Sequence, residues 1–399
     1  MRRIDLKKAQ AARLDTIRGI NRQIVLNYVR EREPISRAEI ARETALQRST
    51  ISTIVDALCN DGLIEEVGEG ESTGGRRPTM LRLRTAGPIA IGVAITPTIT
   101  TIATSDLAGR VLEQEEFLTD PDWRRTSQRI ITRVNHYSNG NQSSIEAVGI
   151  TVPGLIDPAT GNSIYVPYFK WRDLPIGETI SLATGLPVRI DNDANSIALA
   201  ELWFGRPEVR DARDFIMILV AEGVGTGIII DGQVYRGERG AAGEFGHMIV
   251  GAEAPLACSC GNFDCWEAFS SERSAVARYE RLQASGSADS VSVDFPLLVD
   301  RALAGEQSAT DALIETAHYL GIGISNLVVG FSPEVVVVSG EICRAWPLIE
   351  NALSETIERS IRRGLPSARI TASTLGDKPT LMGAISLVLA SKFASVFAS

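Results

Sequence analysis

Apolar side chains at the start of the chain recur at the spacing of α-helices. A first amphipathic face precedes Pro34, which ends that helix. Its members are Ile17, Ile20, Ile24 and Tyr28, with Val25 and Val29 beside them. Ser36-Arg37-Ala38-Glu39 has the spacing of a capping box, which predicts a second, short helix to about Thr44. A third helix is predicted before Gly62. Its apolar face consists of Ile51, Ile54, Val55 and Leu58.

The opposite face of the third predicted helix carries short or hydrogen-bond-donating side chains. They are Arg48, Ser49, Thr50, Ser52 and Thr53. Two such helices with a tight turn between them are typical of a helix-turn-helix, whose second helix reads the DNA major groove. Two further DNA contacts are predicted from these helices: Arg37 at the start of the second helix and Gln47 just before the third.

Two strand-like runs follow and flank a glycine-rich tip, T-G-G-R-R-P at residues 73–78. This arrangement is typical of a winged helix. Arg76 and Arg77 suit insertion into a narrow, electronegative A·T minor groove. The alternative is a solvated hairpin with incidental arginines. Because helix pattern, cap and basic wing agree in order and length, residues 1–87 are predicted to form a DNA-binding domain.

From residue 88 the pattern changes to apolar, strand-like runs that alternate with helical ones. The runs include I-A-I-G-V-A-I, E-A-V-G-I-T-V, F-I-M-I-L-V and E-V-V-V-V-S-G. They predict an α/β body with parallel-sheet elements and two similar halves. A Ser/Gly/Ala/Asp stretch at 284–294 is predicted to be a mobile surface loop. The apolar run at 381–390 is too short to span a bilayer and predicts a buried helix.

Composition and charge narrow the class of protein. The chain has 399 residues, of which 44% are hydrophobic and 22% charged, as in soluble proteins of two or three domains. Its basic start has no apolar stretch after it, so no secretory signal and no membrane partner are expected, and the protein is predicted to be cytoplasmic. Residues 1–87 carry a balance of +4, whereas the rest carries −13, which suits contact with nucleic acid at one end only.

Three of the five cysteines lie in C-S-C-G-N-F-D-C-W-E at residues 258–267. Cytoplasmic thiols stay reduced, which disfavours disulfides here. Cys258, Cys260 and Cys265, with His247 eleven residues upstream, have the donor set of a closed, structural zinc site. Gly261 is expected to relieve the tight turn that brings the first two thiolates together. The alternatives are reduced core cysteines or a redox pair. Isolated Cys59 and Cys343 are predicted to be core thiols.

A second group of candidate residues is rich in carboxylates. D-N-D-A-N at 191–195 follows a strand-like run, so Asn192 and Asp193 are expected where a strand ends and a helix begins. Glu244 and Glu267 flank the proposed metal ligands, so that loop would fix both carboxylates. Carboxylates and an amide around one pocket match a polyhydroxylated ligand such as a sugar. The alternative for 191–195 is an ordinary acidic helix N-terminus.

Together these motifs resemble the ROK family of bacterial sugar-responsive repressors and sugar kinases, over nearly the whole chain. The matching stretches are P-I-S-R-A-E-I-A, S-T-G-G-R-R-P, V-P-G-L-I-D-P-A-T-G, D-N-D-A-N, G-A-A-G-E-F-G-H, the cysteine cluster and L-M-G-A-I. The resemblance implies a winged helix-turn-helix over 1–87 and an actin-like body of two RNase H-like lobes, over 88–196 plus 377–399 and over 197–376. It also implies sugar contacts between the lobes and zinc ligands in the loop. The sugar set is Asn192, Asp193, Glu244, His247 and Glu267, and the zinc set is His247, Cys258, Cys260 and Cys265.

The chain departs from the family's kinases where those enzymes bind ATP. Ala94 and Thr96-Pro97 stand where kinases have an Asp-x-Gly-Gly-Thr turn that holds phosphate and magnesium. Glu222, in A-E-G-V-G at 221–225, would place a negative charge where phosphate should lie, and Ser339-Gly340-Glu341 replaces a Gly-Gly near the adenosine site. Tyr168 replaces an Asn near the sugar. In the reading helix, Gln47 stands where a serine cap is common.

Two functions of different classes follow. The first is a sugar-responsive transcriptional repressor, a homo-oligomer (dimer or tetramer) that binds operator DNA and is not an enzyme. The second is an ATP-dependent sugar kinase with an appended head, in which Asp193 would be the general base. The three altered phosphate elements favour the first, because phosphoryl transfer depends on positioning and metal electrostatics.

Overall fold

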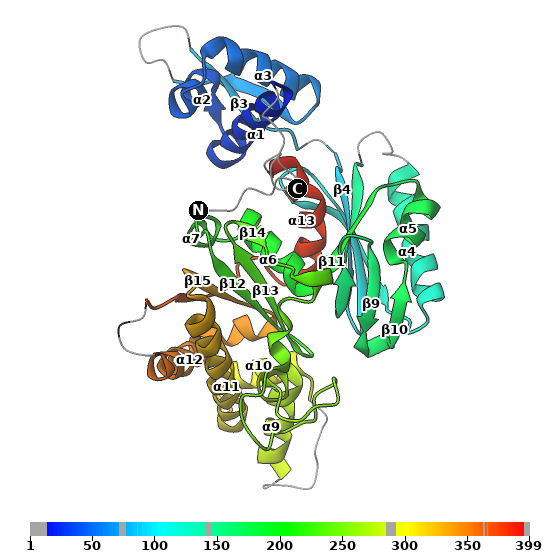
Figure 1. Cartoon of the computed structure of the whole chain (residues 1–399), viewed down its shortest axis with the longest axis vertical. Helices are drawn as coiled ribbons and strands as arrows, with labels where there is room; N and C mark the ends of the chain where they lie inside the picture. The colour runs from blue at the N-terminus through cyan, green and yellow to red at the C-terminus, as the bar shows by residue number, and fades with distance from the viewer. Residues whose placement is uncertain are drawn as a thin grey trace.

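The computed structural model describes residues 14–71, 77–85, 87–139, 145–284, 293–361, 364 and 366–394. A small helical head lies above a body of two α/β lobes (Figure 1). Lobe 1 is built on the five-stranded sheet β11-β7-β4-β5-β6, and lobe 2 on the five-stranded sheet β14-β13-β12-β15-β16. These parts agree with the winged helix-turn-helix and the two α/β halves that the sequence predicts.

The head consists of a helical bundle and a three-stranded sheet in the order β1-β3-β2. Its elements are α1 (Leu14–Arg32), β1 (Ile35–Ser36), α2 (Arg37–Thr44), α3 (Arg48–Asn60), β2 (Ile64–Glu69) and β3 (Thr79–Leu83). The predicted capping box forms: the Ser36 amide donates to Glu39 Oε2 at 2.8 Å and the Glu39 amide to Ser36 Oγ at 3.3 Å. The predicted tip of the wing, including Arg76, lies outside the described residues.

The head core uses a different face of α1 from the one that the isoleucine spacing favours. Val25 and Val29 are fully buried, whereas Ile17 and Ile24 keep 45% and 37% of their surface exposed. The valine face of α1 packs against α2, α3 and β3, and residues from all three elements complete this core. They include Ile40, Ile51, Val55, Leu58, Leu81 and Leu83.

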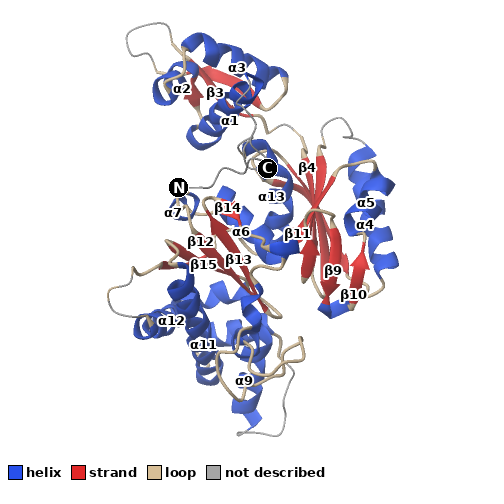
Figure 2. Ribbon diagram, viewed as in Figure 1, coloured by secondary structure: helices blue, strands red, loops and turns tan. Residues whose placement is uncertain are grey.

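Lobe 1 has a mixed sheet, in which β5 is antiparallel to β4 and β6 whereas β4, β7 and β11 are parallel. Its elements are β4 (Ala90–Ile95), β5 (Ile99–Ser105), β6 (Val111–Leu118), α4 (Trp123–Asn139), β7 (Ala147–Val152), β8 (Leu155–Asp157), β9 (Asn162–Val166), β10 (Trp171–Leu174), α5 (Ile176–Thr184), β11 (Val188–Asn192) and the distant α13 (Pro379–Phe393). Helices α4 and α5 cover the sheet face opposite α13 (Figure 2). The predicted buried helix at 381–390 is therefore the layer between this sheet and lobe 2.

Lobe 2 repeats the same sheet topology. On one side of the central strand β12, β13 pairs antiparallel with β12 and β14 pairs antiparallel with β13. On the other side, β12, β15 and β16 are parallel. The strands around β4 in lobe 1 have the same arrangement. Its elements are β12 (Phe215–Val220), β13 (Val224–Ile230), β14 (Gln233–Val234), α8 (Trp266–Ser270), α9 (Glu272–Ala284), α10 (Phe295–Leu303), α11 (Gln307–Phe331), β15 (Val335–Ser339), α12 (Trp346–Ser360) and β16 (Arg369–Ala372). Most of the loop predicted at 284–294 lies outside the described residues.

Helix α6 (Asp193–Phe204), which the short α7 (Pro207–Arg210) follows, packs between α13 and the lobe 2 sheet. Small residues allow these layers to approach closely. A Cβ at Gly149 of β7 would overlap the carbonyl oxygen of Ala384 in α13, and one at Gly227 of β13 would lie 2.5 Å from the carbonyl oxygen of Ala194 in α6. The two lobes are thus joined through two helices in direct contact.

Among the described helices, α11 alone has the length and apolar composition of a membrane-spanning helix. It lies inside lobe 2, where many of its side chains belong to the lobe's main apolar cluster together with residues of β12, β15 and α12. The burial of these side chains accounts for its composition as a core helix.

The head docks on the body through one end of α1. The Asn27 side-chain amide donates to the carbonyl oxygen of Phe393, at the end of α13, at 2.8 Å. The Arg30 guanidinium lies 4.7 Å from the ring centroids of both Trp203, near the end of α6, and Phe393. One apolar cluster continues from the head core into lobe 1 through Leu389 and Phe393. The head is therefore in contact with both central helices of the body.

Candidate functional site

A cavity of about 550 Å³ lies between the two lobes. Lobe 1 contributes the β4–β5 turn at 96–98, residues 153–155 and Tyr168. Lobe 2 contributes the β12–β13 turn, the loop up to His247, and Ser259, Glu267 and Glu272. All five residues of the predicted sugar set line this cavity. Asn192 and Asp193 lie at the boundary between the lobes.

Asn192 and Asp193 lie where β11 ends and α6 begins, as their position in the sequence predicts. Asn192 is also the helix cap: its Oδ1 accepts from the amides of Ala194 at 2.8 Å and Asn195 at 3.2 Å, while its Nδ2 donates to the carbonyl of Gly154 at 2.9 Å. Asn192 is therefore an N-cap, as the simpler interpretation has it, and the capping hydrogen bonds fix the orientation of its side chain at the cavity. One amide hydrogen of Asn192 remains for a ligand.

Asp193 is half-buried, and its carboxylate accepts from the Ala194 amide at 2.8 Å. Burial, reinforced by the nearby Glu244 carboxylate, raises the pKa of Asp193 to about 6, although hydrogen bonding to the Ala194 amide acts in the opposite direction. Asp193 is therefore ionised at neutral pH and can accept hydrogen bonds from sugar hydroxyls. The neighbouring Asp191, which sequence reasoning did not single out, is buried and accepts from Arg236 Nε at 2.7 Å. That ion pair ties the end of β11 to lobe 2.

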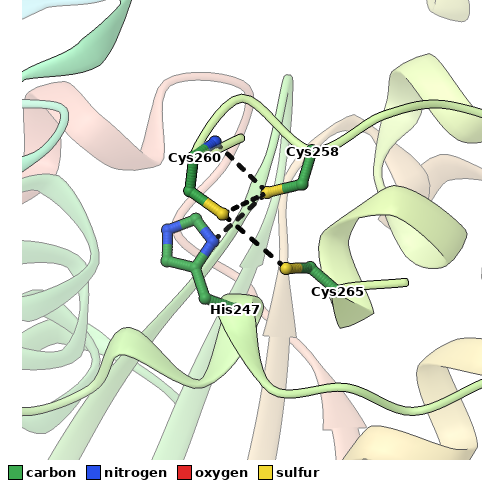
Figure 3. A group of neighbouring side chains, drawn as sticks. All are labelled: His247, Cys258, Cys260 and Cys265. Carbon is green, nitrogen blue, oxygen red and sulfur yellow. Dashed lines mark hydrogen bonds between the residues drawn. The ribbon is translucent and has the colours of Figure 1, made fainter. Parts of the chain in front are cut away.

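The predicted metal ligands converge (Figure 3). One donor atom from each of His247, Cys258, Cys260 and Cys265 lies within 4.8 Å of all the others. Cys258 Sγ is 3.4 Å from His247 Nδ1 and 3.2 Å from Cys260 Sγ, and Cys260 Sγ is 3.8 Å from Cys265 Sγ. Tetrahedral zinc with Zn–S bonds of about 2.3 Å separates its sulfur ligands by about 3.8 Å. The four residues thus have both the donor chemistry and the spacing for a closed metal site.

Contacts between distant segments hold this cluster in place. Ile249 and Cys265 form an antiparallel bridge, and the Trp266 amide donates to the Met248 carbonyl at 2.8 Å, which brings the third cysteine beside His247. Trp266 is fully buried, and its indole N–H donates to the carbonyl of Tyr319 in α11 at 2.9 Å. Gly323 of α11 provides the space, since a Cβ there would overlap the Trp266 ring. Gly261 has φ +89°, as expected for the turn within the cysteine loop.

Glu244 and Glu267 lie on either side of His247. Glu244 Oε2 is 3.6 Å from Nε2 of the imidazole, and Glu267 Oε1 is 4.0 Å from Nδ1. Glu267 Oε1 also accepts from Cys258 Sγ at 2.8 Å and Ser259 Oγ at 3.1 Å. Burial is the main cause that raises the pKa of Glu244. The cysteine loop therefore positions Glu267 directly.

Two of the three altered phosphate elements, the turn at 96–98 and residues 221–225, line the same cavity, whereas Ser339-Gly340-Glu341 is not among its lining residues. Thr96-Pro97-Thr98 form the β4–β5 turn, in which the Thr96 hydroxyl donates to the carbonyl of Ile99 at 2.8 Å. Glu222 and Glu272 line the cavity from lobe 2. Burial, followed by the charges of Glu222 and Glu341, raises the pKa of Glu272 to about 8. Glu272 was missed by sequence reasoning, because the serine-rich S-S-E start of α9 resembles an ordinary helix terminus.

In the head, most of the predicted DNA-contacting side chains face solvent. Gln47, Arg48, Ser49 and Thr53 are exposed, and Thr50 and Ser52 are half-buried. Gln47 is the N-cap of α3 and makes no side-chain capping bond. Arg77 is exposed. Arg37 is different: its guanidinium forms ion pairs with Asp56 of α3 and Glu66 of β2, both at 2.8 Å, so it joins three elements of the head.

Comparisons with known proteins agree with both parts of the structure. Residues 90–391 match the model of the ROK family, and residues 24–77 match that of the MarR family. The chain is 30% identical over 378 residues to the xylose repressor of Bacillus spizizenii, covering 94% of this chain and 96% of that protein. It is 29% identical over 394 residues to the N-acetylglucosamine repressor of Escherichia coli O6:H1, covering 96% and 95%.

Two solved structures resemble different portions of the molecule. A ROK family transcriptional regulator, described as a homologue of the E. coli MLC protein, matches 95% of this chain and 97% of its own, with TM-score 0.79 and 25% identity. A ROK family glucokinase from Streptomyces griseus, in complex with glucose and AMPPNP, matches 75% of this chain and 99% of its own, with TM-score 0.68 and 30% identity. The body thus has a fold found in both regulators and kinases, whereas the match to the regulator extends over almost the whole chain.

Proposed function

Because the chain belongs to the ROK family, we propose that it is a sugar-responsive transcriptional repressor of carbohydrate metabolism genes. The head, over residues 1–87, binds operator DNA, and the cavity between the lobes binds the sugar. The observation that carries this proposal is the combination, in one chain, of an exposed polar face on α3 and an acidic cavity lined by altered phosphate elements. The names of the repressors that match almost the whole chain support it.

The roles of the sugar set follow from their chemistry. Asp193, Glu244 and Glu267 accept hydrogen bonds from hydroxyl groups, and the amide of Asn192 donates one. His247 lies between the two glutamates, with Nε2 towards Glu244. A cavity of about 550 Å³ accommodates a monosaccharide.

Zinc would be a structural ion in this proposal, held by His247, Cys258, Cys260 and Cys265. When bound, it neutralises part of the thiolate charge and fixes the loop. Because Ser259 of that loop donates to Glu267, which follows Cys265 by two residues, loss of the ion would displace the carboxylate before it affected the head.

Helix α6 offers a path between sugar and DNA. Its first turn contains Asp193 at the cavity, and Trp203 near its other end contacts Arg30 of the head. A shift of α6 when the lobes close around a sugar would therefore move the surface on which α1 rests. Coupling needs only a difference in sugar affinity between two positions of the head, typically worth about 1–3 kcal/mol.

The assembly that we propose is a homo-oligomer, a dimer or a tetramer, that acts in the cytoplasm. A two-fold axis would present two α3 helices to successive major grooves, about one helical turn of DNA apart.

The test is DNA binding by the full chain in the presence of sugars. Fluorescence anisotropy with a labelled duplex, selected from a random pool by the protein itself, measures the Kd with and without D-xylose, D-glucose or N-acetyl-D-glucosamine. We expect at least one sugar to change the Kd by about tenfold, equivalent to about 1.4 kcal/mol. If no sugar changes it, the sensing role is wrong.

The second candidate is an ATP-dependent sugar kinase. The position and raised pKa of Asp193, which suit a general base, favour it, as does the similarity of the body to a glucokinase. Glu222 and the Pro97 turn oppose it, because both line the cavity and stand where the resemblance to the family's kinases implies phosphate-binding elements. A coupled assay for ADP release with the same sugars decides: turnover that disappears in Asp193→Asn would establish the kinase.

A further inference from the structure

The charge of the cavity distinguishes between classes of sugar. Five carboxylates line it, and none of the described lining residues is a lysine or an arginine. The five are Asp193, Glu222, Glu244, Glu267 and Glu272. A free sugar and its phosphate ester differ by about two negative charges at neutral pH.

Arginines near the cavity are either paired or outside it. Arg236 pairs with Asp191 at 2.7 Å, and Arg239 is exposed and lies 3.9 Å from Asp157. Arg273, the one cation that acts on the Tyr168 hydroxyl, is exposed and does not line the cavity. A zinc ion bound by three thiolates would leave a net negative charge, so the metal site does not supply the missing cation either.

The carboxylates also act on one another. Burial is the main cause that raises the pKa of Glu272, and the charges of Glu222 and Glu341 raise it further. Mutual repulsion of this kind arises when like charges are close and no cation lies between them. A phosphate group placed in the same cavity would add to this repulsion.

One glycine of the altered phosphate loop, Gly223, has other side chains packed against it. In loops that bind phosphate, glycine allows the anion to approach backbone N–H groups closely. A Cβ at Gly223 would lie 2.6 Å from Glu267 Oε2 and 3.4 Å from Tyr168 Oη, so a carboxylate and a hydroxyl fill that space. Tyr168 reaches this point from lobe 1, and burial together with Glu267, Asp193 and Glu222 raises its pKa. Its neutral hydroxyl can donate to a carboxylate or to a sugar oxygen, whereas the Glu267 carboxylate on this side of Gly223 would repel a phosphate.

We propose that this cavity selects a neutral, unphosphorylated sugar and rejects the phosphate ester of the same sugar, with Glu222 and the Tyr168–Glu267 pair over Gly223 as the discriminating groups. The inference rests on the proposed sugar-binding role and adds the charge class of the effector. A regulator of this type responds to sugar that has entered the cell before any phosphorylating enzyme has acted on it.

The experiment compares three pairs of ligands by isothermal titration calorimetry on the full, zinc-loaded chain. The pairs are D-glucose and glucose 6-phosphate, N-acetyl-D-glucosamine and its 6-phosphate, and D-xylose and xylose 5-phosphate. We expect at least one free sugar to bind at least tenfold more tightly than its phosphate. Glu222→Lys should reduce that ratio by about tenfold, whereas Glu358→Lys, which makes the same charge change on the exposed face of α12, should leave it unchanged.

Each outcome bears on the inference. A phosphate ester that binds as tightly as its parent sugar, or more tightly, overturns the inference and leaves the sugar-sensing function intact. Binding by none of the six ligands overturns both. A ratio that Glu222→Lys leaves unchanged, in protein that still binds DNA with its head, overturns the assignment to Glu222.

Discussion

Arg30 is predicted to transmit the effect of sugar from the body to the head. Its guanidinium lies over the rings of Trp203 and Phe393, 4.7 Å from each centroid, and its Nη2 lies 2.7 Å from Glu31 Oε1. Burial lowers the pKa of Arg30, while Glu31 acts in the opposite direction. Arg30→Ala removes the described contact that joins α1 to the ends of both α6 and α13.

The size of the effect can be worked from these contacts. Each cation–π pair contributes about 0.5–2 kcal/mol, with the higher values for desolvated pairs. The buried Nε and Nη1 of Arg30 have no hydrogen-bond partner among the described residues, so the cost of removing them from water offsets part of that gain. A net contribution of about 1–2 kcal/mol remains. Since couplings between two sites are typically about 1–3 kcal/mol, loss of Arg30 should remove most of the sugar effect.

The assay is the ratio of the DNA Kd with saturating sugar to the Kd without sugar, measured by fluorescence anisotropy. For Arg30→Ala we expect a tenfold sugar effect to fall to about twofold or less, whichever direction the sugar acts, because a loss of about 1 kcal/mol corresponds to about fivefold, while the sugar Kd stays close to that of the unmodified chain. Arg22→Ala is the matched control, because Arg22 lies on the same helix but pairs with Asp61 within the head. A full sugar effect in Arg30→Ala, or an equal loss in Arg22→Ala, would refute the role of this junction.

Three further predictions concern individual side chains. Asp193→Asn should weaken sugar binding by about tenfold or more, since hydrogen bonds to charged groups contribute about 1.5–3 kcal/mol; because the pKa of Asp193 is raised to about 6, calorimetry should find sugar affinity rising from pH 5 to pH 7 in the unmodified chain and not in the variant. Cys260→Ser should lower zinc to well under one ion per chain by metal analysis and abolish the sugar response while DNA binding persists, and a full zinc content in the variant would contradict the assignment of Cys260 as a ligand. Glu201 of α6 is fully buried, and burial raises its pKa to about 7, so its folded form favours the proton and the free energy of unfolding should fall as pH rises from 6 to 8. Urea unfolding should find Glu201→Gln more stable than the unmodified chain by about 1–3 kcal/mol at pH 8, with a smaller difference at pH 6; an equal difference at both pH values would exclude a raised pKa for Glu201.

Features that depend on neighbours in the chain could be predicted from the sequence. The capping box at Ser36 involves residues three positions apart, and the cysteine loop places three ligands within eight positions. The strand-to-helix step at Asn192 and Asp193 is likewise local, and the structure has all of these features where the sequence places them. Spacing fixes such features because the backbone geometry between close residues has few alternatives.

Features that depend on distant segments could not be predicted in this way. Arg37 has the position of a DNA-contacting residue, yet its ion-pair partners lie 19 and 29 residues further along the chain. Glu272 lines the cavity only because α9 begins beside the β12–β13 turn, where its amide donates to the carbonyl of Ala221 at 2.9 Å. The isoleucine and valine faces of α1 are both apolar, so only packing decides which one is buried.

The order in which the ribosome delivers the chain sets a limit on when this protein can become active. The head and the strands of the first sheet emerge early, but the helix that covers one face of that sheet and supports Asn27 and Arg30 is α13, which emerges after all of lobe 2. Until then the sheet face at Gly149 is uncovered and the head lacks its contacts with α13. A nascent or C-terminally shortened chain would therefore contain α3 but lack the contacts that couple the head to the body. Sugar could regulate the DNA affinity of this protein only after α13 has been synthesised.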